Sequence, residues 1–268
     1  MVYNIDYHII DKCNLNCASC NHFSSLVPAG SDTCKSIEQI TADLTLLSKL
    51  KNEFHVISLL GGEPTLHPEL SKILRITREI LPNNVIHLVT NGTKYDKFER
   101  WKDALAENNV VVALTVYPYC NDYGLRTMEL RKILEPEVEV EVNEWALEGF
   151  NYGFLSNRDN VSTDEEIRAC YRRFQCNQLK NGKLYICHFA AQFNYLKDYF
   201  GDKVQFGLDG KEYLDLNGDV TAKDFYNFIY NSHPSICDHC VDAHNKGFSG
   251  PIHPWYVTKK EINEWLID

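Results

Sequence analysis

The sequence predicts an α/β fold, in which a partial barrel of five or six β–α units is followed by a small C-terminal subdomain with a β-hairpin and helices. Strand-like and helix-like segments alternate through about the first 150 residues, and the character of the chain changes near residue 151. Repeated β–α units predict a parallel sheet with helices outside it. A closed eight-unit barrel of the TIM type takes about 250 residues. We therefore expect a partial (β/α)5-6 barrel over residues 1–150 and the smaller subdomain over residues 151–268.

In the first part, short apolar runs alternate with segments whose apolar residues recur at helical spacing. Ser36 and Gln39 have the spacing of a capping box and predict a helix start. Pro68 lies near the start of the next helix, where proline is tolerated. The expected strands are residues 2–10, 55–60, 85–89, 110–116 and 138–142, and the expected helices are residues 36–50, 68–81, 95–106 and 125–134.

The second part is predicted to hold a β-hairpin and several short helices. Residues 174–187 predict the hairpin, because Asn181-Gly182 is the strongest short turn signal. The expected helices are a short one after the capping pair Thr163 and Glu166, two aromatic-rich ones near residues 189–200 and 222–230, and a last one after the capping pair Thr258 and Glu261.

Composition and charge exclude several classes of protein. The 268 residues are 44% hydrophobic and 24% charged, with a net charge of −10 and no dense stripe of Lys and Arg. Nucleic acid is therefore not expected as the main partner. No stretch approaches the roughly 20 apolar residues of a membrane helix, and the N-terminus lacks the pattern of an export signal. We expect a cytoplasmic protein without a membrane partner, whose ten cysteines are metal ligands or reactive thiols rather than disulfides.

Three cysteines follow the first predicted strand, at positions Cys13, Cys17 and Cys20. Thiolates at this spacing can hold one [4Fe–4S] cluster, which normally takes four cysteines. One iron would then lack a protein ligand, and an open metal position is where a small molecule binds and reacts. The alternative is a structural zinc site with His22 as the fourth ligand.

With this C-x3-C-x2-C run at the end of a first strand, the sequence resembles the radical SAM superfamily. The resemblance implies that the open iron binds the amino and carboxylate groups of S-adenosylmethionine. It also implies that an electron donor such as flavodoxin or ferredoxin reduces the cluster. Members usually have an aromatic residue directly before the third cysteine, where this chain has Ser19. We expect either that His22 or Phe23 takes over its contact with the adenine, or that the adenine is held in another way.

The second predicted strand ends in Gly61, Gly62, Glu63 and Pro64. Glycines at a strand end let a ligand approach the backbone, whose carbonyls accept hydrogen bonds from an ammonium group. A lone Gly-Gly is usually only a tight turn. In this position after the cysteine run it matches the Gly-Gly-Glu-Pro motif of the family, which implies contact with the amino group of the cofactor's methionine part.

The next three strands also end in polar residues, at the rim where barrel active sites are built. Asn91 follows the third strand, and the resemblance implies that it lies beside the cofactor. Thr115 and Asn143 end the fourth and fifth strands and are candidates to reach its ribose or carboxylate. Ordinary turn residues would fit all three positions as well.

A second set of cysteines lies in the C-terminal part, at Cys170, Cys176, Cys187, Cys237 and Cys240. A hairpin cysteine and a distant C-x-x-C pair can bring four sulfurs together, and such sites hold zinc or an iron–sulfur cluster. A zinc ribbon fits these residues equally well. The resemblance implies a twitch subdomain, the short form of the SPASM extension, with one auxiliary [4Fe–4S] cluster. Five cysteines compete for four positions, and Cys170 is favoured over Cys176.

The resemblance implies that a 5′-deoxyadenosyl radical abstracts a hydrogen atom from a small polar substrate, such as a sugar or an aminocyclitol. Oxidation would follow if the auxiliary cluster accepts an electron, as in an aminocyclitol dehydrogenase of this family. Epimerisation would follow if a cysteine returns a hydrogen atom, and Cys34, Cys120 and Cys176 are open for that role. Modification of a peptide is the alternative enzyme function, and a two-cluster electron carrier or a zinc-ribbon protein is the alternative without catalysis. The motif at Gly61 favours the enzyme, because an electron carrier needs no ammonium-binding turn.

Overall fold

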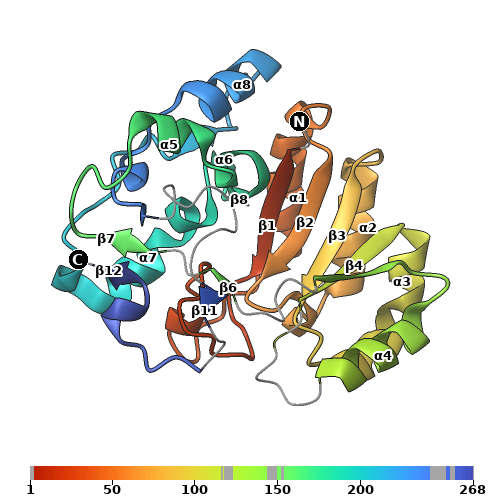
Figure 1. Ribbon diagram of the computed structural model, residues 1–268. Helices are drawn as coiled ribbons and strands as arrows, with labels where there is room; N and C mark the ends of the chain where they lie inside the picture. The colour runs from red at the N-terminus through yellow and green to blue at the C-terminus, as the bar shows by residue number, and fades with distance from the viewer. Residues whose placement is uncertain are drawn as a thin grey trace.

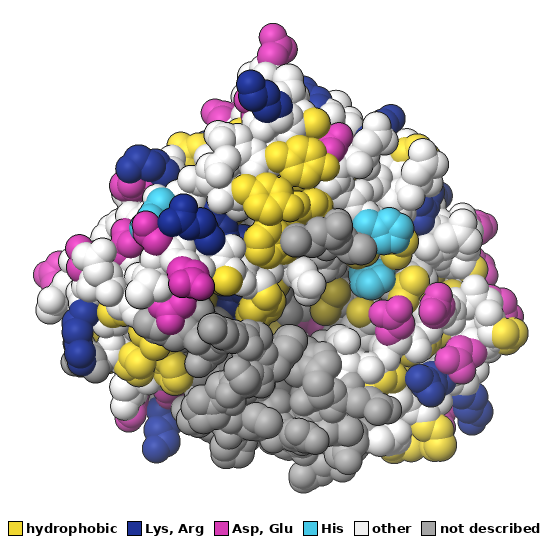
Figure 2. Space-filling model, turned by 45° about the horizontal axis from the view of Figure 1, so that its top comes forward, with side chains coloured by type: hydrophobic (Ala, Val, Ile, Leu, Met, Phe, Trp, Pro, Cys, Tyr) yellow, Lys and Arg dark blue, Asp and Glu magenta, His cyan; other side chains and the backbone are white. Residues whose placement is uncertain are grey.

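The computed structural model describes residues 3–115, 117, 123–143, 150–151, 154–241, 252–253 and 257–267. None of the helices in these ranges has the length and hydropathy that a membrane span requires. On the face drawn in Figure 2, Lys and Arg side chains are interspersed with Asp and Glu. Charges of mixed sign are typical of the surface of a globular protein.

An eight-stranded sheet forms the centre of the molecule, with the order β10-β9-β8-β1-β2-β3-β4-β5 (Figure 1). The strands are β1 (Asn4–Ile10), β2 (Val56–Gly61), β3 (Val85–Thr90), β4 (Val110–Thr115), β5 (Val140–Asn143), β8 (Asn177–Lys180), β9 (Lys183–Tyr185) and β10 (Tyr213–Asp215). Strands β1 to β5 and β8 pair in parallel, whereas β9 and β10 are antiparallel to their neighbours. The predicted α/β fold with a partial barrel is confirmed.

Helices connect the parallel strands and cover the sheet. They are α1 (Ile37–Leu47), α2 (Leu70–Ile80), α3 (Lys102–Glu107), α4 (Tyr123–Leu134), α5 (Asp164–Ala169), α6 (Arg172–Gln175), α7 (His188–Phe200) and α8 (Ala222–Asn231). Short 3-10 helices are η1 (Ser24–Leu26), η2 (Ser48–Leu50), η3 (Pro64–Leu66), η4 (Tyr95–Trp101), η6 (Gly201–Lys203), η7 (Ser235–Cys237) and η9 (Ile262–Glu264). In Figure 1, α1 to α4 lie with β2 to β4, and α5 to α8 lie on the other side of β1.

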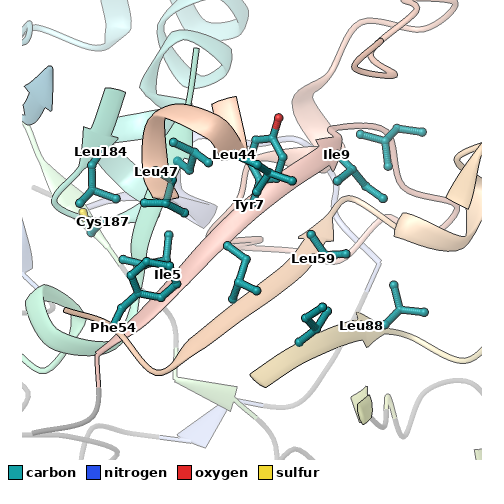
Figure 3. Packing of buried hydrophobic residues seen from close by; sticks show 14 of the residues in the cluster. Ile5, Tyr7, Ile9, Leu44, Leu47, Phe54, Leu59, Leu88, Leu184 and Cys187 are labelled. Carbon is teal, nitrogen blue, oxygen red and sulfur yellow. The ribbon is translucent and has the colours of Figure 1, made fainter. Parts of the chain in front are cut away.

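Strand β1 is buried on both faces, as is usual in a parallel sheet. Its residues alternate between the two faces, so Ile5, Tyr7 and Ile9 point to the same side. Figure 3 shows these residues packed with Leu44 and Leu47 of α1. The opposite face of β1 carries polar side chains, and it faces the candidate site described below.

The hairpin β8–β9 forms at the predicted place. Asn181 and Gly182 have φ values of 53° and 70°, the left-handed backbone that a two-residue hairpin turn requires. Strand β8 also pairs in parallel with β1, with Ile5 opposite Asn177. The hairpin therefore extends the sheet of the barrel and brings α6 next to β1. A domain boundary near residue 150 stays a prediction.

The prediction of a final α-helix after Thr258 and Glu261 is wrong. Residues 262–264 form the 3-10 helix η9, and β12 (Leu266–Ile267) pairs in parallel with β7 (Leu155–Ser156). The remaining short pair is β6 (Phe150–Asn151) with β11 (Ile252–His253). The hydroxyl of Thr258 donates to the Glu264 carboxylate instead of capping a helix. Tertiary contacts outweigh the local signal here, because Trp265 is fully buried and its indole N–H donates to the Cys20 carbonyl at 3.1 Å.

Candidate active site

The loop after β1 places Cys13, Cys17 and Cys20 on one side of a cavity of about 360 Å³. This loop is held by the C-terminal residues of the chain. The Thr258 N–H donates to the Asn16 carbonyl at 2.9 Å, in addition to the bond between Trp265 and Cys20. Hydrogen bonds that do not involve the three thiols therefore help to hold the cysteine loop in its conformation.

Gly61 and Gly62 line the same cavity and lie directly against the cysteine loop. Gly61 has a φ of +150°, and a Cβ atom on it would lie 1.8 Å from the Ile10 carbonyl oxygen. A Cβ atom on Gly62 would lie 2.2 Å from the carbonyl group of Lys12. The Gly62 N–H donates to the Ile10 carbonyl at 2.9 Å, which closes this contact. Both glycines are needed because two backbone segments approach each other here.

Glu63 joins the loop after β2 to the end of β3. Its Oε1 atom accepts hydrogen bonds from the Thr65 N–H at 3.1 Å, the Thr65 hydroxyl at 2.6 Å and the Thr90 hydroxyl at 2.7 Å. Its Oε2 atom accepts from the Asn91 N–H at 2.9 Å. Burial raises the pKa of Glu63, and these hydrogen bonds oppose the shift. The carboxylate therefore fixes the backbone on which Asn91 stands.

Asn91 connects this rim with the cysteine loop. Its side-chain amide donates to Asn14 Oδ1 at 3.0 Å and lies 3.8 Å from the sulfur of Cys13. Its Oδ1 atom accepts from the Thr93 N–H and hydroxyl. Asn91 also lines the cavity, so it is able to orient Cys13 toward a ligand there.

The other residues predicted at this rim lie at different depths. Thr115 lines the cavity. Asn143 lies behind it and donates to the Thr115 hydroxyl at 3.4 Å. Pro64 is buried at the start of η3, next to Glu63 and outside the cavity lining.

Phe23 is not placed at the cavity. Its backbone is left-handed, with a φ of 53°, and its ring is fully buried against Phe189 at 5.9 Å between centroids. His22 does line the cavity, and its Nδ1 atom lies 2.7 Å from Nε2 of His8. Burial lowers the pKa of His22 well below its usual value, so its ring is neutral.

The wall opposite the rim of β2 to β4 comes from the inner face of β1, from α6 with its flanking residues, and from the first residue of α7. It carries Asp6, Tyr171, Arg172, Gln175, Cys176 and His188. Asp6 is 7% exposed and accepts from the Gln178 side-chain amide at 3.1 Å. Burial raises the pKa of Asp6 to about 7, while hydrogen bonds from Ser58 and Gln178 act against the shift. Asp6 was not predicted as a site residue, although a carboxyl group within an apolar strand is a signal that could have identified it.

A second, smaller pocket lies behind this wall. It is lined by four cysteines and mostly apolar neighbours: Cys170, Cys187, Cys237 and Cys240, with Ile167, Ile186, Phe189 and Ile236. Cys176 lies at the main cavity instead. Arg172 lines both the cavity and the pocket, so the two adjoin. Cys34 forms a β-bridge with Ile10, and Cys120 lies outside the described residues.

The model of the radical SAM superfamily matches residues 7–148, just over half of the chain. The protein belongs to the radical SAM superfamily. It is therefore an enzyme, and its family uses a [4Fe–4S] cluster together with S-adenosylmethionine. None of the curated proteins compared with the sequence matches it.

Solved structures to which this chain is similar include those of BtrN, anSMEcpe and SuiB. BtrN in complex with AdoMet and 2-DOIA has 16% sequence identity and a TM-score of 0.53, with 94% of this chain and 99% of BtrN covered. The enzyme anSMEcpe with bound AdoMet has 17% identity and a TM-score of 0.47, covering 83% and 80%. SuiB of Streptococcus suis, bound to S-adenosylmethionine, has 12% identity and a TM-score of 0.39, covering 92% and 68%. At these identities the similarity to BtrN shows the fold.

The residues present fit the cofactors of this radical SAM enzyme. Ser25 lines the cavity, and its hydroxyl group is buried without a hydrogen-bond partner, so it is available to a ligand. In the second pocket, the Nη1 atom of Arg173 is also buried without a partner. A buried cationic donor is costly unless an anion lies nearby, and four thiolates around a bound cluster would supply one. Within the described ranges, no group of three or more His, Cys, Asp or Glu side chains is arranged to hold a single metal ion.

We expect Asp6→Asn to stabilise the enzyme more at high pH than at low pH. The pKa of Asp6 is about 7 in the folded state and 3.8 without burial. Between these values the folded protein retains a proton that the unfolded chain has lost, so the free energy of unfolding falls as pH rises from about 4 to 7. Each pKa unit corresponds to about 1.4 kcal/mol. Above pH 7, the neutral amide of Asn should therefore raise the free energy of unfolding by a few kcal/mol. Anaerobic thermal denaturation at pH 5 and pH 8 measures it.

The exposed Asp219 provides the control for this prediction. Asp219→Asn changes the charge equally but removes no buried carboxyl group, and should leave stability unchanged at both pH values. An Asp6→Asn variant that is destabilised equally at pH 5 and pH 8 would contradict the assignment of a raised pKa to Asp6.

Proposed function

We propose that Cys13, Cys17 and Cys20 bind the catalytic [4Fe–4S] cluster, and that the enzyme abstracts a hydrogen atom from a small polar substrate. When bound, the reduced cluster supplies the electron that cleaves S-adenosylmethionine to methionine and a 5′-deoxyadenosyl radical. The observation that supports this function is the composition of one cavity. It has the three cysteines and the glycine pair on one side, and a polar wall with Asp6 on the other.

The two sides suggest a division of labour. Gly61 and Gly62 leave room for the methionine part of the cofactor, and Ser25 and Asn91 offer hydrogen bonds beside it. Asp6, held by Gln178, would accept a hydrogen bond from a substrate hydroxyl or amine. The cavity has the volume of a small-molecule site. A sugar-like or aminocyclitol-like substrate is also supported by BtrN, whose structure contains AdoMet and 2-DOIA.

An auxiliary [4Fe–4S] cluster is proposed for the second pocket, with Cys170, Cys187, Cys237 and Cys240 as ligands. An electron donor of the flavodoxin or ferredoxin class would serve the enzyme. Because Arg172 lines both the cavity and the pocket, a cluster in the pocket would lie close enough to the substrate to exchange electrons with it.

Anaerobic reconstitution with iron and sulfide, followed by dithionite and S-adenosylmethionine, tests the proposal. We expect 5′-deoxyadenosine and about eight irons per chain, since each cubane holds four. Two clusters that bind no S-adenosylmethionine would indicate an electron carrier. A content of about four irons and one zinc per chain would indicate that the second pocket is a zinc ribbon and holds no auxiliary cluster.

One observation favours epimerisation over oxidation, namely the place of Cys176 in the cavity rather than in the second pocket. Burial raises the pKa of Cys176 far above its usual value, with Asp6 adding to the shift, so its sulfur carries a hydrogen. The S–H bond would break as a C–H bond forms on the substrate radical. The sulfur radical would then take one electron and one proton, with an iron–sulfur or flavin protein as reductant.

We expect Cys176→Ser to remove a source of hydrogen without removing a cluster. In D2O without added substrate, the wild type should form 5′-deoxyadenosine that carries deuterium, because the thiol exchanges with solvent. Cys176→Ser should still form 5′-deoxyadenosine but lose this label, since a hydroxyl is a poor hydrogen-atom donor. Mass spectrometry of the product measures the label.

Cys34→Ser is the control for this experiment, because Cys34 lies outside the cavity lining. It should retain the wild-type label and iron content. A Cys176→Ser variant that keeps the label excludes Cys176 as the donor. If the Cys176→Ser variant instead lacks about four irons, Cys176 is a cluster ligand.

A further inference from the structure

Arg173 is the second residue of α6 and is 2% exposed, which is unusual for a cation. Its Nε atom donates to the Ile229 carbonyl at 3.1 Å. Its Nη2 atom donates to the Ser232 carbonyl at 2.7 Å and to the Ser232 hydroxyl at 3.1 Å. The guanidinium is therefore fixed in orientation by the end of α8 and the residue that follows it.

The third nitrogen of Arg173 has a different environment. Nη1 is buried and has no hydrogen-bond partner, and Arg173 lines the pocket of the four cysteines. Among the described residues, no carboxylate forms an ion pair with Arg173. The sulfurs of Cys237, Cys170 and Cys187 lie close enough to act electrostatically on it. The pocket thus presents one oriented donor and one positive charge to whatever these cysteines bind.

We infer that Arg173 donates through Nη1 to a sulfur of the auxiliary cluster and thereby raises the reduction potential of that cluster. The inference rests on the proposed auxiliary cluster. Reduction adds a negative charge to the cluster, and a nearby cation or hydrogen bond stabilises the reduced state more than the oxidised state. Arg173 is thus a positioning residue, which acts on the reduction potential of the cluster and not on the substrate.

The test measures the midpoint potential of the auxiliary cluster alone, by a redox titration followed by electron paramagnetic resonance. The variant with Cys13, Cys17 and Cys20 replaced by serine provides the background, because it retains only the auxiliary cluster. Adding Arg173→Met should shift the midpoint to more negative potential. Arg173→Gln, which can still donate to the Ile229 carbonyl, should shift it in the same direction, whereas Arg173→Lys keeps the charge and should shift it less.

Arg168→Met is the matched control. Arg168 lies on the neighbouring helix α5, its side chain is 68% exposed, and it pairs with Asp164 of the same helix. The substitution removes an equal charge near the pocket and should leave the potential unchanged, because solvent screens that charge. Equal potentials for Arg173→Met and the background would overturn the inference. Loss of the cluster in both the Met and Gln variants would also overturn it, because Arg173 would then act in assembly. Zinc in the background protein would instead refute the auxiliary cluster itself, so the two failures are distinguishable.

Discussion

Replacing Cys13, Cys17 and Cys20 together by serine is expected to remove about four of eight irons and to abolish formation of 5′-deoxyadenosine. Serine is nearly isosteric with cysteine, but its hydroxyl does not replace a thiolate as a ligand of this cluster. The three side chains line the cavity on the side of the glycine pair. Without the cluster the sulfonium of S-adenosylmethionine receives no electron.

This variant should keep its fold, which makes the loss of activity interpretable. The cysteine loop is held by the Trp265 indole on the Cys20 carbonyl and by the Thr258 N–H on the Asn16 carbonyl. The Ser19 hydroxyl also donates to the Glu264 carbonyl. None of these bonds uses a thiol. We therefore expect a thermal midpoint close to that of the wild type without reconstituted iron.

Iron and sulfide analysis together with chromatography of the nucleoside products measures the effect. Cys34→Ser serves as control and should leave both iron content and product unchanged. Cys34 forms a β-bridge with Ile10 and does not line the cavity. Normal turnover by the triple variant would refute the proposed ligands. An unchanged iron content with no turnover would show that these cysteines act in another step.

Local signals in the sequence were sufficient for much of the fold. Asn181-Gly182 predicted a hairpin turn, and both residues have the required left-handed backbone. Ser36 predicted a helix start, and its hydroxyl accepts from the Gln39 N–H at 3.2 Å. These features depend on residues that are at most three positions apart. A capping or turn signal can therefore be read without knowing the rest of the chain.

Features that depend on distant residues could not be predicted in this way. Thr258 has a capping spacing, but Trp265 packs under the cysteine loop and the helix does not form. Phe23 follows the cysteines closely, yet its backbone turns it into the core. The choice between Cys170 and Cys176 depends on how α6 crosses β1, which assigns one to each pocket. Spacing along the chain contains no information about such a crossing.

Gly62→Ala is expected to abolish binding of S-adenosylmethionine and to destabilise the fold by more than about 4 kcal/mol, which is at the extreme for a single substitution. The added Cβ would lie 2.2 Å from backbone atoms of Lys12, which cannot move aside by rotating a side chain. Either the end of β2 or the cysteine loop must shift. The bond from Gly62 to the Ile10 carbonyl would be strained or lost, and the cysteines would move with it.

Gly124→Ala is the matched control, because a Cβ there would meet nothing within 4 Å. Gly124 lies in α4, where alanine is favoured over glycine by roughly 0.5–1 kcal/mol. Two measurements separate the role of Gly62 in stability from its role in binding. Denaturant unfolding measures the stability, and equilibrium binding measures the affinity for S-adenosylmethionine. If Gly62→Ala were as stable as the wild type but did not bind the cofactor, the glycine would serve only the ligand's approach. Loss of both, as we expect, would mean that the motif first holds two backbone segments together and positions the cofactor as a consequence.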